Sequence, residues 1–276
     1  MMKKLYAALT FLVLLLAGLM KIRFDTHDFK VKKVVFNSAK IPPRSRFTML
    51  QMSDIHDHVF GRDNEQLINT VQQANADIIV LTGDLIDKST VWFNHVYSLV
   101  ERLTAINQHV YFVCGNHEWE NGMTAQFLKG LRERGITLLD NENTSVIHEK
   151  ATITLAGVND SSTEHDNVTE TFKNISNHNY TVLLSHAPGV IMKDEPIPAD
   201  LILSGHTHGG QIRFPLIGAL IAPGQGYFPK YDKGTYKLSS NRHLYIDSGV
   251  GTTRLPIRFL NKSQISLITI ENTSAQ

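Results

Sequence analysis

The most restrictive feature of this sequence is a set of five short apolar runs, each ending in polar residues that are able to bind a metal ion. Segments with helical spacing lie between several of them, which is typical of a parallel sheet covered by helices. The carboxyl ends of such strands lie at one edge of the sheet, so loops from five strands can meet in one crevice. We therefore predict an α/β fold with its functional site at that edge. The five runs are 47–52, 78–82, 110–114, 181–184 and 201–203.

Other segments complete the predicted domain. Apolar residues recur at helical spacing in 67–74 and 96–106. Further strands are expected where apolar runs lie between turn-forming residues. These strands are 29–36, 153–158, 235–238, 243–247 and 264–270. The predicted division of the chain is a membrane-targeting segment at 1–24, a tether with the first strand at 25–46, and one large domain at 47–276.

The amino-terminal segment has the composition of a membrane helix. Residues 5–20 are apolar and uncharged, and lysine or arginine flanks them on both sides. With the next few residues included, such a helix approaches the roughly 30 Å of a bilayer core. No small-x-small cleavage pattern follows, so we predict an uncleaved signal anchor rather than a cleaved signal peptide. We expect a cell-membrane protein whose domain lies on the extracytoplasmic side, although the flanking charges determine the orientation only weakly.

Charge and cysteine content exclude several classes of partner and site. The 27 Lys and Arg residues and the 26 Asp and Glu residues give a formal net charge of +1. Because no strong positive field results, we expect no nucleic-acid partner. The single cysteine, Cys114, cannot form an intrachain disulfide or half of a two-thiolate zinc site. The sequence makes no prediction about the oligomeric state.

The polar endings of the apolar runs supply imidazole, carboxylate and carboxamide groups. Asp54 and His56 are two residues apart, so an extended backbone points both side chains to one side, and the same holds for His206 and His208. Glycines next to these residues allow sharp turns of the backbone. The candidate metal ligands are Asp54, His56, Asp84, Asn116, His186, His206 and His208.

The motifs around these ligands follow a specific order. In chain order they are Asp54-x-His56, Gly83-Asp84, Gly115-Asn116-His117-Glu118, His186 and Gly205-His206-x-His208. Their order, spacing and flanking glycines resemble the complete signature of the calcineurin-like metallophosphoesterases, from about Phe47 to Ile270. The residues after His208 resemble a membrane-anchored or exported bacterial branch, which includes cell-wall-associated phosphoesterases and UDP-2,3-diacylglucosamine hydrolases.

The resemblance implies a fold, a cofactor and a mechanism. The fold would be a four-layer αββα sandwich, and the cofactor two divalent metal ions, for which nitrogen and oxygen ligands suit Mn, Fe or Zn. A hydroxide bridging the ions would attack phosphorus in line. His117 would protonate the leaving oxygen or stabilise charge in the transition state. The resemblance assigns three ligands to each ion and one residue, Asp84, that bridges the two ions. The first ion has Asp54, His56 and His208, and the second has Asn116, His186 and His206.

These features predict a dinuclear phosphoesterase that hydrolyses a phosphodiester or pyrophosphate bond of a cell-envelope substrate. A phosphomonoesterase, including a phosphoprotein phosphatase, is the alternative because the metal centre is common to both. A non-catalytic metal-binding scaffold would be expected to have lost some of the metal-ligand residues, and none of them is missing here. Residues 214–223 are strongly apolar and form either a lipid-facing lip, which suits a lipid-linked substrate, or a hairpin buried against the second sheet.

Four further polar residues lie close to the motifs. Arg213 follows the last ligand and is a candidate for binding a phosphate through two N–H groups. Asp57 and His58 lie beside the first motif and are candidates for contact with the substrate. Glu118 is either a partner that orients an imidazole ligand or a surface charge.

Overall fold

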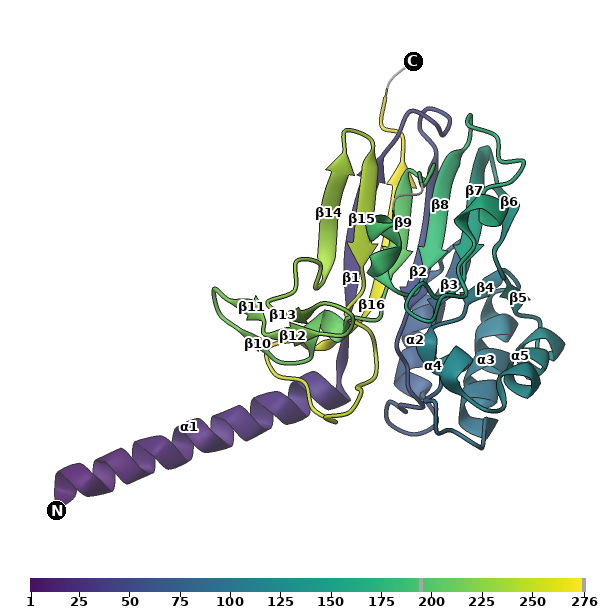
Figure 1. The fold of residues 1–276 in the computed structure, drawn as a ribbon. Coiled ribbons are helices and arrows are strands. Elements are labelled where there is room, and N and C mark those ends of the chain that lie inside the picture. Colours follow the sequence, from purple (N-terminus) through teal and green to yellow (C-terminus); the bar gives the residue numbers. More distant parts are fainter. Residues whose placement is uncertain (194–195, 275–276) are drawn as a thin grey trace.

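Two six-stranded sheets pack face to face in the computed structural model, which describes residues 1–193 and 196–274 (Figure 1). The strands of the first sheet, in spatial order, are β1 (Phe29–Asn37), β16 (Ser263–Glu271), β2 (Arg46–Met52), β3 (Ile78–Thr82), β4 (Val110–Val113) and β5 (Thr137–Leu138). Those of the second are β14 (Gly234–Ser239), β15 (Arg242–Ile246), β9 (Leu201–Ser204), β8 (Tyr180–Ser185), β7 (Ala151–Val158) and β6 (Glu142–His148).

Parallel pairing brings the ends of the motif-bearing strands to one edge of each sheet. β2, β3 and β4 run parallel in the first sheet, and β7, β8, β9 and β15 run parallel in the second. The antiparallel neighbours are β16, which pairs with β2, and the edge strands β14 and β6. The predicted strands agree with the observed ones to within two residues at their ends, whereas β5 and β6 were not predicted.

The central strands are apolar throughout because both of their faces are covered. In β2, Phe47 and Met49 belong to the core between the sheets, whereas Leu50 and Met52 face the helices. This alternation follows from the two-residue period of a strand. A continuous apolar run is therefore the expected sequence of a strand that is buried on both sides.

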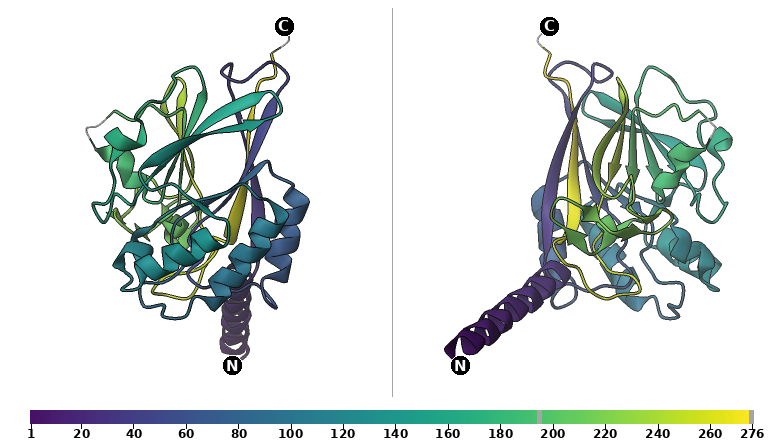
Figure 2. Two further views of the ribbon diagram at one scale, coloured as in Figure 1. Left: turned by 90° about the vertical axis from the view of Figure 1, so that its right-hand side faces the viewer. Right: turned by 60° about the vertical axis from the view of Figure 1, so that its left-hand side comes forward.

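Helices cover the outer faces of both sheets, which confirms the predicted αββα layers (Figure 2). On the first sheet they are α2 (Glu65–Ala74), α3 (Asn94–Ile106) and α5 (Thr124–Glu133). The layer on the second sheet is thinner and contains α6 (Val168–Thr171) and the 3₁₀ turn η1 (Pro188–Met192). The short helix α4 (Asn116–Glu120) begins at the candidate site.

The amino-terminal segment forms the helix α1 (Met2–His27), which projects from the domain (Figure 1). It is long and apolar enough to cross a membrane, and its apolar part is not buried by the domain. Residues 25–27 were expected in a tether, but they form the last turn of α1, where Asp25 and Thr26 are buried. The side chains of Asp25 and Thr26 accept hydrogen bonds from the backbone N–H groups of Asn261 and Arg258, which attach this turn to the domain.

The apolar segment that follows the last motif forms two small hairpins. They consist of β10 (Arg213–Phe214) with β11 (Gly218–Ala219), and of β12 (Ile221–Ala222) with β13 (Gly226–Tyr227). The small residues Ala219 and Ala222 are buried, whereas large side chains such as Leu216 and Ile217 are exposed. The alternative of a hairpin buried against the second sheet was therefore wrong.

Candidate metal centre

The five predicted loops converge on one cluster of buried side chains. Each loop follows the carboxyl end of a parallel strand, namely β2, β3, β4, β8 or β9. Of the seven candidate ligands, six side chains are buried and that of Asn116 lies at the amino terminus of α4. The topology therefore brings together residues that are separated by up to 154 positions, from Asp54 to His208.

The backbone at the ligands is unusual. Five of the seven candidates have positive φ angles, which are uncommon outside glycine but are tolerated best by Asn, Asp and His. Such residues turn the chain within one or two positions, so that neighbouring side chains can face the same point. The surrounding structure must fix each of these conformations, which cost about 1–3 kcal/mol. The five residues are Asp54, His56, Asp84, His206 and His208.

The first group of candidate ligands consists of Asp54, His56 and His208. The Nε2 atoms of the two imidazoles lie 3.2 Å apart, and Oδ1 of Asp54 lies 3.4 Å from Nε2 of His208. Nδ1 of His56 lies 2.9 Å from Oδ1 of Asp87. Because this contact places a proton on Nδ1, the lone pair of Nε2 points toward His208.

The second group consists of Asp84, His186 and His206. Nε2 of His186 lies 3.1 Å from Oδ2 of Asp84 and 3.1 Å from Nδ1 of His206. In the neutral ring, Nδ1 of His186 donates a hydrogen bond of 2.8 Å to the carbonyl of Thr82, and Nε2 is then the nitrogen that can bind a metal ion. The buried Oδ1 of Asn116 has no hydrogen-bond partner among the described residues.

Asp84 is a member of the second group and also faces His56 of the first. Its Oδ2 lies 3.1 Å from Nε2 of His186 and 3.6 Å from Nε2 of His56. Its Oδ1 accepts a hydrogen bond of 3.0 Å from the backbone N–H of His117, which fixes the orientation of the carboxylate. One oxygen is therefore held by the protein, and the other faces the two sets of imidazoles.

This arrangement fits a pair of divalent metal ions. Facing imidazole lone pairs repel one another, and a cation between them removes the repulsion. With a metal–nitrogen distance of about 2.0–2.1 Å, two imidazoles on one tetrahedral ion are separated by about 3.3 Å, close to the observed 3.2 Å between His56 and His208. The buried Oδ1 of Asn116, at the start of α4, is a further oxygen that has no hydrogen-bond partner within the described part of the chain.

Comparison with known proteins agrees with this geometry. Residues 47–210 match the sequence profile of the calcineurin-like phosphoesterases. The chain belongs to this family. It is therefore a phosphoester hydrolase, and members of the family typically bind two divalent metal ions.

Three relatives illustrate the similarity. The chain is 33% identical over 256 residues to the Bacillus subtilis (strain 168) protein YkuE, an uncharacterized metallophosphoesterase, with 91% of this chain and 88% of the relative covered. It is 29% identical to an uncharacterized metallophosphoesterase of Aquifex aeolicus, with coverage of 90% and 94%. It is 27% identical to a Danio rerio transmembrane protein with a metallophosphoesterase domain, with coverage of 88% and 57%.

The ionisable groups at this phosphoesterase centre shift one another's pKa values. Burial would lower the pKa of His186, but the adjacent Asp84 raises it well above that of a free imidazole. Burial alone would raise the pKa of Asp84, but His186 and His56 hold it well below the ordinary value. Burial lowers the pKa of His208 well below that of a free imidazole, and the neighbouring His56 adds to this effect. At neutral pH, Asp84 is therefore an anion and His208 is neutral, and these are the forms that bind metal ions.

Two of the motif glycines are required by close packing rather than by a turn. Gly115 has an ordinary φ of −96°, but a Cβ added there would lie 2.7 Å from the backbone nitrogen of Asp84 and would overlap its carboxylate. A Cβ at Gly205 would overlap Ser53 Oγ and Asp54 Oδ2. Gly83, with a φ of +85°, does occupy a turn of the expected kind.

Asp87 is a residue that the sequence analysis missed. Its Oδ1 lies 2.9 Å from Nδ1 of His56 and 3.2 Å from Nδ1 of His117. Partial burial would raise the pKa of Asp87, but these imidazoles hold it well below the usual range. One ionised carboxylate therefore orients both a candidate ligand and the candidate acid. The available signal was a second aspartate three positions after Asp84 in the same loop.

Glu118 has neither of its expected roles. The side chain is fully buried, and its carboxylate accepts hydrogen bonds from the backbone N–H groups of Gly115 (2.8 Å), Asp84 (2.8 Å) and Leu85 (2.7 Å). Burial, reinforced by the charge of Asp84, raises the pKa of Glu118 to about 7. Glu118 thus joins the loops after β3 and β4 and contacts no imidazole through these bonds.

The three candidates for substrate contact lie in different environments. Arg213 is paired with Asp232 at 2.5 Å, so binding of a phosphate by Arg213 would have to break this ion pair. Asp57 accepts a hydrogen bond from the hydroxyl of Thr90. The ring of His58 packs against Phe60, with centroids 4.5 Å apart, and burial lowers the pKa of His58 to about 4.

A cavity of about 170 Å³ adjoins the second group of ligands. His206 forms part of its wall, together with the polar side chains of Ser161, Ser162, Lys193 and Gln225. Lys193 is paired with Asp166 at one end of this cavity. Hydroxyl, amide and ammonium groups next to the metal centre provide hydrogen-bond donors that suit an anionic substrate.

Proposed function

We propose that this phosphoesterase hydrolyses a phosphodiester or pyrophosphate bond of a lipid-linked cell-envelope substrate. The observation that carries the proposal is the position of Oδ2 of Asp84, which faces both sets of imidazoles. The first ion would be held by Asp54, His56 and His208, and the second by Asn116, His186 and His206. When bound, the two ions supply Lewis acidity at the phosphoryl oxygens and lower the pKa of water.

His117 is the proposed proton donor to the leaving oxygen. Its ring centroid lies 4.6 Å from that of His56, at the edge of the cluster. Nδ1 of His117 lies 3.1 Å from the backbone nitrogen of Lys88, which donates to it when Nδ1 carries no proton. The neutral tautomer then has its proton on Nε2, where a leaving group can receive it. In the doubly protonated ring, Nδ1 instead donates to Asp87.

The position of the domain relative to a membrane supports an envelope substrate. We propose that α1 is an uncleaved anchor in the cell membrane and that the domain from residue 47 onward acts on the extracytoplasmic side. The apolar part of α1 is not buried by the domain. The exposed apolar hairpins lie on the side of the domain from which α1 emerges (Figure 1). A substrate with a lipid chain would reach a site held in this way.

A panel of substrates tests the proposed reaction. The full-length protein in detergent micelles would be loaded with Mn, Fe or Zn and assayed with a bis-aryl phosphate, an aryl monophosphate and a lipid-linked pyrophosphate. We expect the lipid-linked substrate to have the highest kcat/KM. Preference for the monophosphate would instead favour a phosphomonoesterase.

Replacement of a proposed metal ligand tests whether the measured activity comes from the proposed metal centre. Asp84→Ala should lose bound metal and activity together, because this carboxylate faces the imidazoles of both groups. Asp63→Ala, at an exposed loop residue, is the matched control and should retain both. Full activity of the Asp84 variant would refute the proposed centre.

A further inference from the structure

The two hairpins present an apolar surface to solvent. Isolated exposed apolar side chains are common on proteins, whereas contiguous patches mark sites of interaction. The exposed fraction of Leu216 is 108%, although its φ of +67° is a conformation that usually belongs to glycine or asparagine. We call these residues the hairpin patch; they are Phe214, Leu216, Ile217, Ile221, Tyr227 and Phe228.

The hairpins and the neighbouring loop contain lysine and arginine but no acidic residue of their own. Residues 211–231 and 248–262 lack Asp and Glu, whereas the adjacent Asp232 pairs with Arg213. Lys230 and Arg254 lie in these segments, and Lys262 pairs with Asp28. Apolar side chains flanked by lysine and arginine are typical of surfaces that lie in the interface of an anionic bilayer.

Hydrogen bonds connect the hairpin patch to α1 through a short loop. The backbone N–H of Arg213, in β10, donates to the carbonyl of Phe259 at 3.0 Å. The backbone N–H of the adjacent Arg258 donates to Thr26 Oγ1, in the last turn of α1, at 2.8 Å. Nζ of Lys262 lies 4.0 Å from the ring centroid of Phe24, also in α1. The hairpins and α1 are therefore held in a fixed relation.

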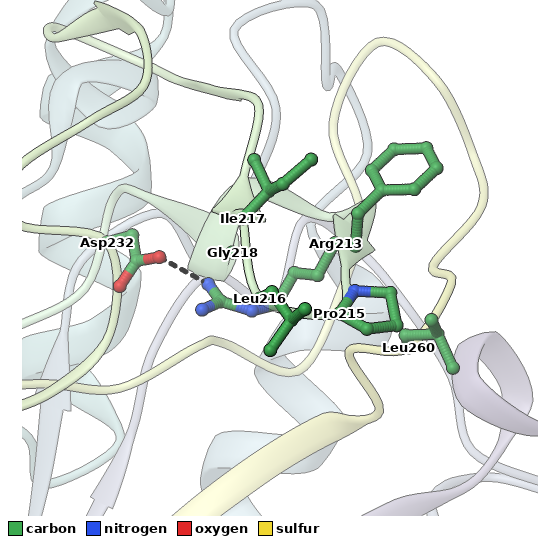
Figure 3. A pocket seen from close by; sticks show the side chains of 8 residues that line it. Arg213, Pro215, Leu216, Ile217, Gly218, Asp232 and Leu260 are labelled. Atoms are coloured by element: carbon green, nitrogen blue, oxygen red, sulfur yellow. Dashed lines mark hydrogen bonds and ion pairs between the residues drawn. The ribbon is translucent and has the colours of Figure 1, made fainter.

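A cavity of about 600 Å³ lies beneath the tip of the first hairpin (Figure 3). Leu216, Ile217 and Leu260 contribute to its wall, and Leu260 lies on the side of α1. The Arg213–Asp232 ion pair forms a polar end of the same cavity. The cavity opens among the apolar side chains of the patch, so a bilayer that covers the patch also covers its mouth.

We infer that the hairpin patch inserts into the interface of the same bilayer that holds α1. This inference rests on the proposed anchor and adds a second point of contact. A bilayer is the favoured occupant because α1 brings it to this end of the domain, and because the flanking charges are basic. The insertion would tilt the domain toward the membrane and fix the distance of the metal centre from the lipid headgroups.

Depth-dependent quenching tests the insertion with the full-length protein. The Leu216→Cys variant would be labelled at the new cysteine with an environment-sensitive fluorophore. The labelled protein would then be reconstituted into vesicles that contain anionic lipid and lipid with a nitroxide on its acyl chain. The wild type is the labelling blank, since its single cysteine, Cys114, is buried. Leu12→Cys reports on the anchor. Ile147→Cys, with an exposed fraction of 71% on β6, is the matched control away from the hairpins.

We expect the nitroxide lipid to quench most of the fluorescence at positions 12 and 216 and little of it at position 147. Quenching at 12 but not at 216 would overturn the inserted patch while leaving the anchor in place. No quenching at either position would overturn both proposals. A blue shift in the emission of the label at position 216 without quenching by the nitroxide lipid would indicate that a second copy of the protein covers the patch, and would overturn the proposal. Ile217→Cys repeats the measurement if the first variant folds poorly.

Discussion

The side-chain amide of Asn261 donates a hydrogen bond of 2.7 Å to the backbone carbonyl of His208. The backbone N–H of the same asparagine donates to Asp25, in the last turn of α1, at 3.3 Å. The buried guanidinium of Arg258 also approaches the carbonyl of His208, at 3.4 Å. A candidate metal ligand and the end of α1 are therefore held by one loop.

Replacement of Asn261 by alanine should weaken metal binding. The change removes the 2.7 Å hydrogen bond that positions the His208 backbone, and loss of such outer contacts typically lowers metal affinity about 10–100-fold. Titration of metal-depleted protein measures this effect. Asn143→Ala, which removes amide donors to carbonyls beside α6, is the control and should leave the affinity unchanged. Equal affinities in the two variants would contradict the positioning role.

Replacement of His117 by alanine should separate metal binding from turnover. His117 is not one of the proposed metal ligands, although it lies beside His56 and Asp84, so metal content should remain near that of the wild type. Loss of a general acid typically lowers kcat about 10²–10⁴-fold. The effect should be smallest with a substrate whose leaving group is a weakly basic phenolate, since that group requires no proton. His178→Ala, at an exposed position, is the control, and wild-type turnover of the His117 variant would disprove the role.

Two glycine replacements in one region should differ in stability. Gly115→Ala forces a Cβ against the Asp84 backbone and carboxylate, and overpacking of this kind typically costs about 1–3 kcal/mol. Gly122→Ala meets no atom within 4 Å and should be nearly neutral. Urea unfolding of both variants measures the difference. Only the first variant should also lose bound metal, and a similar loss in both would argue against the steric explanation.

A buried carboxyl that is not a candidate ligand should make stability depend on pH. Burial raises the pKa of Asp247 to about 6, although Ser266 and Gln264 donate hydrogen bonds to it. Between the unfolded pKa of about 3.9 and the folded value, the folded state binds more protons, so the free energy of unfolding decreases as pH rises.

Urea unfolding of metal-depleted protein between pH 4 and pH 7 measures this slope. The contribution of Asp247 should fall by at most about 3 kcal/mol across the window. Asp247→Asn should flatten the curve over the same range, because amide and acid have similar shape but only the acid titrates. An unchanged slope in this variant would assign the pH dependence to other groups.

The convergence of the candidate ligands could be predicted because each motif follows the carboxyl end of a parallel strand. The sequence did not show that β2, β3 and β4 belong to one sheet and β8 and β9 to the other. The face-to-face packing of the two sheets brings these two edges together. Cover on both faces of the central strands could be predicted from apolar runs without alternation, whereas the four αββα layers were implied by the resemblance to the family.

Contacts that depend on how loops fold back could not be predicted in this way. Glu118 lies three residues after Gly115, yet its carboxylate also receives N–H groups from the loop after β3. Asp87 reaches His56 and His117 only because that loop bends over the cluster. The exposure of Leu216 could not be predicted either, because an apolar segment has the same composition whether the domain or a bilayer covers it.

The burial of Asp25 and Thr26 also bears on how a soluble form of this enzyme must be made. A truncation after residue 24 would place a charged amino terminus inside a packed helical turn and would discard Lys21, whose ammonium group pairs with Asp25 at 2.6 Å. A fragment that starts one helical turn earlier keeps the ion pair between Lys21 and Asp25. The last turn of α1 therefore belongs structurally to the domain, and a soluble fragment should retain it.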